Sequence, residues 1–473
     1  MTTAAPPASY ATDRRYQALL LGVVMLAVTA FGSLMTLVTV ALGEIGDELG
    51  ASRATMTWAI TGLMLAMVVV TPMAGTLGDV HGHRKVMLFG LIGGAVATAL
   101  CGVAWNAASL IGFRVLFGVF AACVNPNAMS LMMHAFGPER RATAVGWFQF
   151  AVTGAPTIGL VIGGPLIDAF GWRVVFFSFA AVSLVAFVVG LPTLRPIPRQ
   201  MGRPLDLVGA LLLGFGVLLA LLAITRVTTA IRSDGLAAAL TDPGALVFAV
   251  LSVATIRAFV GAERRVAFPM IKLEYFGRRN FTLPLLSSAA VQFAYMGGFV
   301  ITPALLEDHY GWMIGSIALL MMPRPGAFSI ASLLGGWAPG RVGFRLPIVF
   351  GALFMMASMV FFALAAPLTS GLGVAFIVIG LVLSGTASGI SQPAIAALSV
   401  ASVDEADMGV ANGMNQQITW VGIVAGIQTM NVLIGDNAST SRFVATYMVG
   451  LAVTGLALLA ALALRKDDSP LAS

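Results

Sequence analysis

The sequence predicts an all-α integral membrane protein with fourteen transmembrane helices. The first observation behind this prediction is composition: 59% of the 473 residues are hydrophobic, only 10% are charged, and the mean hydropathy is +0.95. A soluble domain carries about 25% charged residues. The second observation is that the apolar residues form separate runs of about 20, the length that crosses a bilayer as a helix.

Fourteen apolar runs follow one another along the chain. They cover residues 17–42, 54–76, 86–104, 108–134, 142–167, 172–193, 206–225, 243–262, 281–305, 312–336, 346–366, 371–396, 408–434 and 443–464. Because the bilayer core offers no water to backbone groups, each run is expected to be helical. The first run is too long for a cleavable signal peptide and lacks a small-residue cleavage site, so we expect it to stay as the first helix.

The distribution of basic residues predicts the orientation of these helices. An even number of spans places both termini on one side of the membrane. Of the 26 Lys and Arg residues, eighteen lie in segments on the side of the amino terminus, five lie on the opposite side, and Arg114, Arg257 and Arg324 fall within helices. Since cytoplasmic loops are enriched in Lys and Arg, we expect a multi-pass protein of the bacterial plasma membrane with both termini in the cytoplasm.

A polar island, GTLGDVHGHRKVM, separates the second and third apolar runs at residues 75–87. A second island, GWAPGRVGFRL, covers residues 336–346, and a constant offset of 261 residues places its Gly343 on Gly82. Glycine permits turns that are too tight for a side chain. Both islands lie between the second and third helix of a block of six, which indicates a duplicated transporter-like architecture.

The duplication predicts how the chain is divided. We expect residues 1–199 to form a first six-helix half and residues 281–473 to form a second one. Residues 200–280 then hold two inserted transmembrane helices with their linkers, and these have no partner in the repeat.

Four short motifs stand out in addition to the duplication. The first island contains Gly75, Asp79, Gly82, Arg84 and Lys85. The fourth run contains LIGFRVLFGVFAA, with Arg114, Phe117 and Gly118; the fifth contains APTIGLVIGG, with Ala155, Gly159, Leu160, Gly163 and Gly164. The tenth run contains GWMIGSIALLMMPRPGAFSIASLLGGW, with Pro323 and Arg324.

These motifs resemble those of the major facilitator superfamily, and specifically its fourteen-helix drug:proton antiporter branch of EmrB/QacA type. The match covers the signature loop after helix 2, the helix 4 motif, the helix 5 antiporter motif and helix 10. Phe117 stands where the helix 4 motif usually has glutamine, and Ala155 and Leu160 replace a glycine and a proline of the helix 5 motif. The resemblance implies a major facilitator fold that works by alternating access between two halves.

The resemblance also implies a role for the first island. Asp79 would contact the positive amino end of a helix from the other half, and this contact would latch one conformation. The glycines and basic residues Gly75, Gly82, Arg84 and Lys85 would shape the same latch. The alternative is an ordinary cytoplasmic loop whose basic side chains contact lipid phosphates.

Two arginines are expected at membrane depth. A charge there costs about 2.5–3.5 kcal/mol on insertion scales, so it usually faces a cavity or a partner. Arg114 has no acidic neighbour in sequence, and we expect it to have a functional role that organises the core. Arg324 lies between Pro323 and Pro325, which free backbone carbonyls that it could bond; structural bracing is the alternative for Arg324.

The glycines of the fifth run predict close packing. Gly159 and Gly163 are four residues apart, which is the small-xxx-small spacing of closely approaching helices, and Gly164 follows them. Static packing and movement between the halves both fit this pattern.

A few polar and aromatic side chains within the apolar runs are candidates for a substrate cavity. They are Gln149, Phe150, Gln292, Tyr295, Asn412, Asn415, Gln416 and Trp420. Aromatic side chains and methionines adapt to large apolar molecules, and a few amides orient them. The alternative for each polar residue is an interhelical hydrogen bond worth about 0.6 kcal/mol.

No enzyme, metal or cofactor site is expected. His81 and His83 are close in sequence but have no acidic ligand set beside them. The sequence contains no phosphate-binding glycine loop that ends in Lys-Ser or Lys-Thr. Cys101 and Cys123 lie within apolar runs, which favours buried free thiols.

The sequence therefore favours a secondary active transporter that exports hydrophobic or amphiphilic compounds, either drugs or lipid-like molecules. The alternatives are an uncoupled or weakly coupled lipid transporter and a nutrient importer. We expect a small hydrophobic substrate, membrane lipids and protons as candidate partners, no nucleic acid, and a monomer.

The coupling ion is the main difficulty for the antiporter assignment. The drug-antiporter branch usually carries an aspartate in helix 1 where this chain has Leu34. A proton-coupling group would be an acid whose pKa is raised by desolvation. The nearest acid is Glu44, at the outer end of helix 1, and it is the candidate coupling residue. We expect weak or absent proton coupling.

Overall fold

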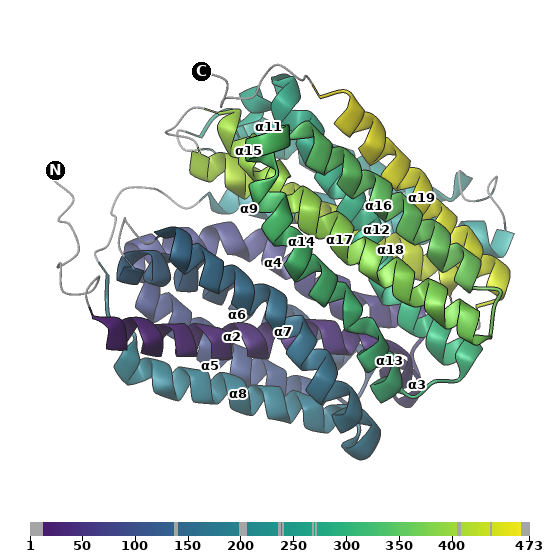
Figure 1. The fold of residues 1–473 in the computed structure, drawn as a ribbon, viewed down its shortest axis with the longest axis horizontal. Helices are drawn as coiled ribbons and strands as arrows, with labels where there is room; N and C mark the ends of the chain where they lie inside the picture. Colours follow the sequence, from purple (N-terminus) through teal and green to yellow (C-terminus); the bar gives the residue numbers. More distant parts are fainter. Residues whose placement is uncertain are drawn as a thin grey trace. The chain divides into compact units, whose positions relative to one another are not determined.

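The computed structural model describes residues 13–136, 141–197, 206–234, 238, 241–266, 269, 272–403, 408–435 and 438–464. Every regular element in these residues is a helix (Figure 1). Contacts divide the chain into two units, the first comprising residues 1–51 and 58–210 and the second comprising residues 52–57 and 211–473.

The first unit contains the elements α2 to α8. They are α2 (Arg14–Val40), α3 (Leu42–Glu48), α4 (Arg53–His81), α5 (His83–Gly102), α6 (Ala107–Phe136), α7 (Arg141–Phe170) and α8 (Trp172–Thr193). The first turn of α4 groups with the second unit and the remainder with the first. Helix α2 runs beside α8 (Figure 1) and also packs against α7.

The second unit contains the remaining elements. They are α9 (Leu207–Asp234), α11 (Pro243–Glu263), the 3₁₀ helix η2 (Leu273–Gly277), α12 (Arg279–Tyr310), α13 (Ile314–Met321), α14 (Pro323–Trp337), α15 (Pro339–Val342), α16 (Arg345–Ala365), α17 (Gly371–Ala401), α18 (Met408–Ile434) and α19 (Thr440–Leu462). Helices α14 and α17 lie side by side (Figure 1).

The two inserted helices, α9 and α11, pack within the second unit. Phe259 of α11 is buried in one apolar cluster with Tyr275, Phe281 and Leu285, and Leu212 of α9 packs against this cluster. The contacts therefore group most of the inserted pair with the second six-helix half. The separate three-part division of the chain remains a prediction.

The fourteen-helix membrane fold that the sequence predicts is confirmed. Among the described residues, 13 helices are long and apolar enough to cross a membrane, and the shorter apolar stretch Thr157–Phe170 belongs to the 30-residue helix α7. These helices coincide with the fourteen apolar runs, although several extend further than expected. Helix α4, for example, continues to His81, whereas the sequence predicted its end near residue 76.

Helix ends follow ordinary capping chemistry. Asp13 caps α2 because its carboxylate accepts a hydrogen bond from the Tyr16 backbone N–H at 2.9 Å. Asp242 caps α11 in the same way, with Pro243 in the first turn. Helix α12 ends at Gly311, whose φ of 64° is in the left-handed region that favours glycine.

Most of the first island is helical rather than a loop, which differs from the expectation from the sequence. Gly75 lies inside α4, and a single residue, Gly82, connects α4 to α5 with a φ of 101°. Gly343, its counterpart in the second island, also has a positive φ, of 75°. Because side chains are strained in this conformation, the duplicated glycine makes the same sharp turn in both units.

A duplicated arginine braces each turn. Arg84 donates from Nη2 to the Leu191 carbonyl at 2.7 Å, near the carboxyl end of α8. Arg345 donates from Nη2 to the Leu462 carbonyl at 2.6 Å, at the end of α19. Each arginine thus satisfies a terminal carbonyl of the last helix of its own half, where a cation is also favoured by the helix dipole.

The glycines of α7 pack directly against α2. A Cβ atom at Gly159 would lie 2.6 Å from the Ser33 Cα atom, and one at Gly163 would overlap the Leu37 side chain. Gly164 is buried beside them. The predicted close packing is therefore present between two helices of the same unit, while a role in movement between the halves remains a prediction.

This packing predicts an ordered series of stabilities. Gly159→Ala forces Cβ against the backbone of Ser33 and should destabilise the protein by about 1–3 kcal/mol, as overpacking does. Gly163→Ala should cost less, because the end of the Leu37 side chain can move. Gly154→Ala lies in the same helix, and its Cβ would meet no described neighbouring side chain or helix within 4 Å, so it controls for helix propensity. Thermal unfolding of the purified variants measures this; equal unfolding temperatures for the three would contradict the packing.

Candidate functional site

Arg114 is the most deeply buried charge of the first unit. Its side chain has no solvent exposure, and its Nε donates to the Ala59 carbonyl of α4 at 3.0 Å. Among the described residues, neither Nη1 nor Nη2 has a hydrogen-bond partner. The Arg114 Cζ atom lies 5.6 Å from the Phe117 ring centroid, and the Phe31 ring lies 5.1 Å from that ring. The guanidinium is thus oriented by one bond while its two terminal nitrogens remain unpaired.

Leucine occupies the helix 1 position at which the resemblance leads one to expect an acid. Leu34 lies in α2 and is fully buried. No ion pair of Arg114 is present within the described part of the chain. Because a buried charge without a partner is strongly destabilising, the unpaired guanidinium is an energetic exception in this unit.

Arg324 is equally buried but is held in place by its neighbours. Its Nη2 donates to the Tyr295 carbonyl of α12 at 2.6 Å, and its Cζ lies 3.5 Å from the Tyr295 ring centroid and 4.2 Å from that of Phe299. We expected Arg324 to bond carbonyls freed by the flanking prolines, but its acceptor lies on another helix. Arg324 thereby ties α14 to α12.

Two of the candidate cavity residues of the second unit, Gln292 and Tyr295, are engaged with other helices. The Gln292 Oε1 accepts a hydrogen bond from Ser388 Oγ at 3.0 Å, and the Tyr295 ring stacks on Arg324. Asn415 is buried, and its Oδ1 has no partner among the residues that the structure describes. Trp420 is half-buried and Gln416 is exposed. The side chains of Gln149, Phe150 and Asn412 lie outside the described residues, so the cavity as a whole remains a prediction.

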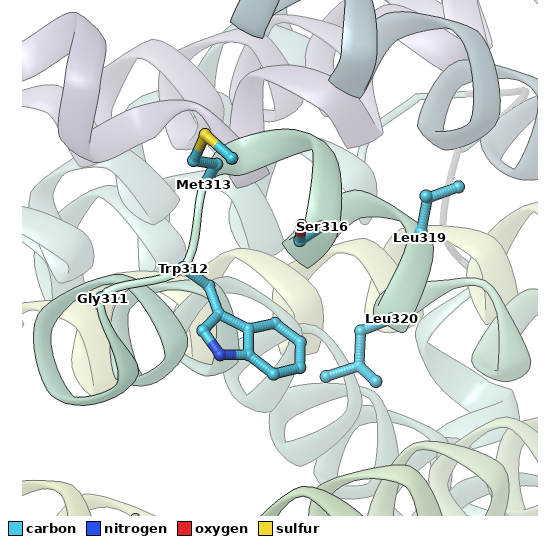
Figure 2. Close-up of a pocket in the computed structure, with 6 residues that line it drawn as sticks. All are labelled: Gly311, Trp312, Met313, Ser316, Leu319 and Leu320. Atoms are coloured by element: carbon cyan, nitrogen blue, oxygen red, sulfur yellow. The ribbon is translucent and has the colours of Figure 1, made fainter.

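A pocket of about 630 Å³ opens where α12 gives way to α13 (Figure 2). It is lined by Gly311, Trp312, Met313, Ser316, Leu319 and Leu320. The Trp312 indole and the Leu320 side chain point toward the same open space (Figure 2). None of the sequence-predicted cavity residues lines this pocket, which is mainly apolar and lies at one end of its unit.

Around the first island, three polar side chains form a connected cluster. The Asp79 carboxylate lies 3.1 Å from His83 Nε2, and His83 Nδ1 lies 2.8 Å from Asn127 Oδ1. Asn127 is fully buried in α6, and its Nδ2 donates to the carbonyls of Ala74 and Cys123. We call Asp79, His83 and Asn127 the junction cluster, because they join α4, α5 and α6.

The remaining latch residues have different surroundings. Arg84 is committed to the α8 carbonyl described above, Lys85 is exposed, and Gly75 is helical. The proposed contact of Asp79 with a helix of the other half remains a prediction. Within its own unit, Asp79 is paired with His83.

Glu44 lies in α3, beyond the first span, as expected for the outer end of helix 1. Burial raises the pKa of the Glu44 carboxyl, and the negative charges of Asp168 and Glu48 raise it further. Glu48 itself is paired with Arg173 and accepts from Trp172 Nε1 at 2.6 Å, and Arg173 holds the pKa of the Glu48 carboxyl below its ordinary value. Glu44 therefore retains its proton more readily than an ordinary glutamate.

Sequence reasoning missed the junction cluster because it treated His83 as part of a loop. A usable signal was present: Asn127 belongs to the stretch Asn125-Pro126-Asn127 inside an apolar run, where an amide needs a partner. The described residues also contain no group of three His, Cys, Asp or Glu side chains placed to hold a metal ion.

Two helical units, each with a buried arginine and with a glycine turn at an equivalent position, are the arrangement of a membrane transporter. The family model described as the Major Facilitator Superfamily matches residues 19–427, and the chain belongs to this family of transporters. No catalytic activity is indicated by this family.

Relatives and solved structures agree with this assignment. The Tetracenomycin C resistance and export protein of Streptomyces glaucescens is 29% identical over 91% of this chain and 78% of its own length. The Multidrug export protein EmrB of Escherichia coli is 29% identical over 62% of this chain and 58% of its own length. The inward-facing, unoccupied crystal structure of a bacterial homologue of the human lysosomal transporter Spinster has a TM-score of 0.66 at 16% identity, with 95% of this chain and 96% of that chain covered. The resemblance to EmrB-type drug exporters is thereby confirmed, and the Spinster homologue shows the same fold.

Proposed function

We propose that this protein exports hydrophobic or amphiphilic compounds by alternating access between its two six-helix halves. The observation that carries the proposal is the similarity, over 91% of the chain, to a protein named for resistance to and export of tetracenomycin C. The mostly apolar interior, with a few buried amides such as Gln292 and Asn415, suits such substrates. The substrate and its direction are proposals for this chain.

Uncoupled or weakly coupled movement of lipid-like molecules is the second candidate. The observation that favours it is the fully buried Leu34, which leaves the middle of α2 without a titratable acid. A nutrient importer has no observation in its favour. We further propose that the protein acts as a monomer among membrane lipids, with protons as the candidate coupling ion and with no nucleic acid partner.

The proposed location is a bacterial plasma membrane with both termini in the cytoplasm. The excess of Lys and Arg on the side of the termini supports this orientation. Asn106, in the short connection between α5 and α6, should then face the outside, and Lys85, at the start of α5, should face the cytoplasm.

Cysteine labelling tests this orientation in intact cells. Asn106→Cys should react with a membrane-impermeant maleimide from outside, whereas Lys85→Cys should react only after the cells are opened. The native Cys101 and Cys123 are buried and should give little background. Labelling of Lys85→Cys alone in intact cells would reverse the orientation.

Flux measurements test the export and its coupling together. Purified protein in proteoliposomes should move hydrophobic fluorescent dyes, and an imposed pH gradient should change the accumulated amount little. Glu44→Gln should leave this flux near that of wild type, as should the control Asp47→Asn, which alters an exposed acid of the same helix. Strong proton-driven accumulation that Glu44→Gln abolishes would contradict weak coupling and assign Glu44 as the proton carrier.

A further inference from the structure

Arg114 and Arg324 are both fully or almost fully buried, and neither has an ion pair among the described residues, but Arg324 is held by more contacts. Arg324 is bonded to the Tyr295 carbonyl and lies against two aromatic rings. Arg114 makes a single bond, through Nε, and Nη1 and Nη2 have no partner among the described residues. Since a guanidinium stays protonated in proteins, the first unit carries a positive charge for which its described side chains supply no counter-charge.

The unpaired part of Arg114 is the part that recognises anions. The bond from Nε to the Ala59 carbonyl fixes the plane of the guanidinium. Nη1 and Nη2 form the fork that binds a carboxylate or a similar oxyanion through two charge-assisted hydrogen bonds. The neighbouring groups are aromatic, with Phe117 beside the guanidinium and Phe31 beside Phe117. Such surroundings favour an anion that is carried on an apolar or aromatic framework.

We propose that Arg114 binds the anionic group of a hydrophobic organic acid, so that the substrate supplies the missing negative charge. This inference rests on the proposed export function and narrows its substrate class. A cationic compound is repelled at this position, and a neutral compound leaves the guanidinium unpaired, so the anion gains the most from binding there.

Matched xanthene dyes test this selectivity. The probes are fluorescein, which is anionic near neutral pH, its neutral diacetate ester, and the cationic tetramethylrhodamine methyl ester. Binding to the purified protein and flux into proteoliposomes are measured for each dye. Wild type should prefer fluorescein. Arg114→Gln should lower the affinity for fluorescein about tenfold or more, and it should leave the affinity for the neutral diacetate ester unchanged. Arg114→Lys, which keeps the charge but loses the fork, should give an intermediate affinity.

The control variant is Arg324→Gln, which removes an almost fully buried arginine whose Nη2 bonds the Tyr295 carbonyl and whose guanidinium lies against two aromatic rings. It should keep the preference for the anionic dye. Thermal unfolding of each variant shows whether it is folded. Equal fluorescein binding by wild type and by folded Arg114→Gln would overturn the inference. Transport of only the neutral and cationic dyes would also overturn it, although the proposed export function would stand. Binding of none of the dyes would overturn both.

A second inference comes from the hydrogen-bond geometry of the junction cluster. Both amide hydrogens of Asn127 are used, because its Nδ2 donates to the Ala74 carbonyl at 3.1 Å and to the Cys123 carbonyl at 2.8 Å. The Asn127 Oδ1 that faces His83 is therefore an acceptor, and His83 Nδ1 must carry a hydrogen. His83 Nε2 faces the Asp79 carboxylate, also an acceptor. Each ring nitrogen thus needs a proton for both contacts to be favourable.

The second island shows that the turn itself does not need this cluster. At the offset of 261 residues, Gly340 stands in the position of Asp79 and Phe344 in the position of His83. The turn residues Gly82 and Gly343 nevertheless share a positive φ. The acid and the imidazole are therefore an addition in the first island that the backbone geometry does not require.

We infer that His83 is a proton-binding site that controls Asp79. When the ring is doubly protonated it holds the Asp79 carboxylate within its own unit; when the Nε2 proton leaves, a lone pair faces the carboxylate and the contact is lost. Around the ring, α4 contributes the Asp79 carboxylate, and α6 contributes the Asn127 amide with the Cys123 thiol one turn away. On α5 itself, Arg84 is directed to α8.

Thermal unfolding of a double-mutant cycle tests this inference without any transport assay. The cycle comprises wild type, Asp79→Asn, His83→Gln and the double variant, measured at about pH 6 and at about pH 8. At the lower pH the two single changes should be coupled, so that their losses in unfolding temperature are not additive. At the higher pH the coupling should vanish. His81→Gln, which alters an exposed histidine of the same island, should show no coupling with Asp79→Asn at either pH.

A coupling between positions 79 and 83 that is equal at both pH values would overturn the inference, because it would show a contact that does not depend on a proton. Additive losses at the lower pH would overturn it as well.

Discussion

Inside a bilayer, a polar group can be satisfied only by the protein itself, and many buried polar groups in the described part of this chain are satisfied in this way. Hydroxyl side chains bond the carbonyl one turn earlier on their own helix, as Thr36 does with Gly32 and Ser391 with Ala387. Arginines bond the terminal carbonyls of neighbouring helices. Against this background, a buried polar group without a partner marks a place where the structure has another requirement to meet. Arg114 is such a place.

The same constraint explains the glycines. Helices in lipid are held together by close contact rather than by a hydrophobic force, so small residues are needed where two backbones meet. In the first unit, α7 meets α2 through Gly159, and in the second unit α18 meets α12 through Gly422 and Gly426, which face Ala289 and Phe293. In each half the fifth helix thus packs on the first through glycine. The duplication visible in the islands therefore extends to the packing of each unit, whereas the chemistry of the two halves differs.

The sequence was sufficient for the fold because hydropathy and the repeated islands are local signals that the bilayer enforces. It located Arg84, Arg114 and Arg324 but not the groups to which they are bonded. The carbonyl acceptors of Arg84 and Arg324 lie on other helices, and a backbone carbonyl leaves no trace in sequence. The junction cluster was missed because α4 continues through the expected loop, which brings Asp79 and His83 onto adjoining helical turns beside Asn127. For the cavity residues, the direction of the side chain decides whether it contacts substrate or another helix. The periodicity of the sequence does not give this direction.

The central claim is that the Arg114 charge is not neutralised by the chain itself. A structure determined by electron cryo-microscopy in lipid nanodiscs, without added substrate, tests it most directly. We expect the Arg114 Nε to bond the Ala59 carbonyl, and we expect no carboxylate of the protein within hydrogen-bond distance of the Arg114 Nη1 or Nη2 atoms. An aspartate or glutamate side chain of this chain bonded to the Arg114 guanidinium would contradict it.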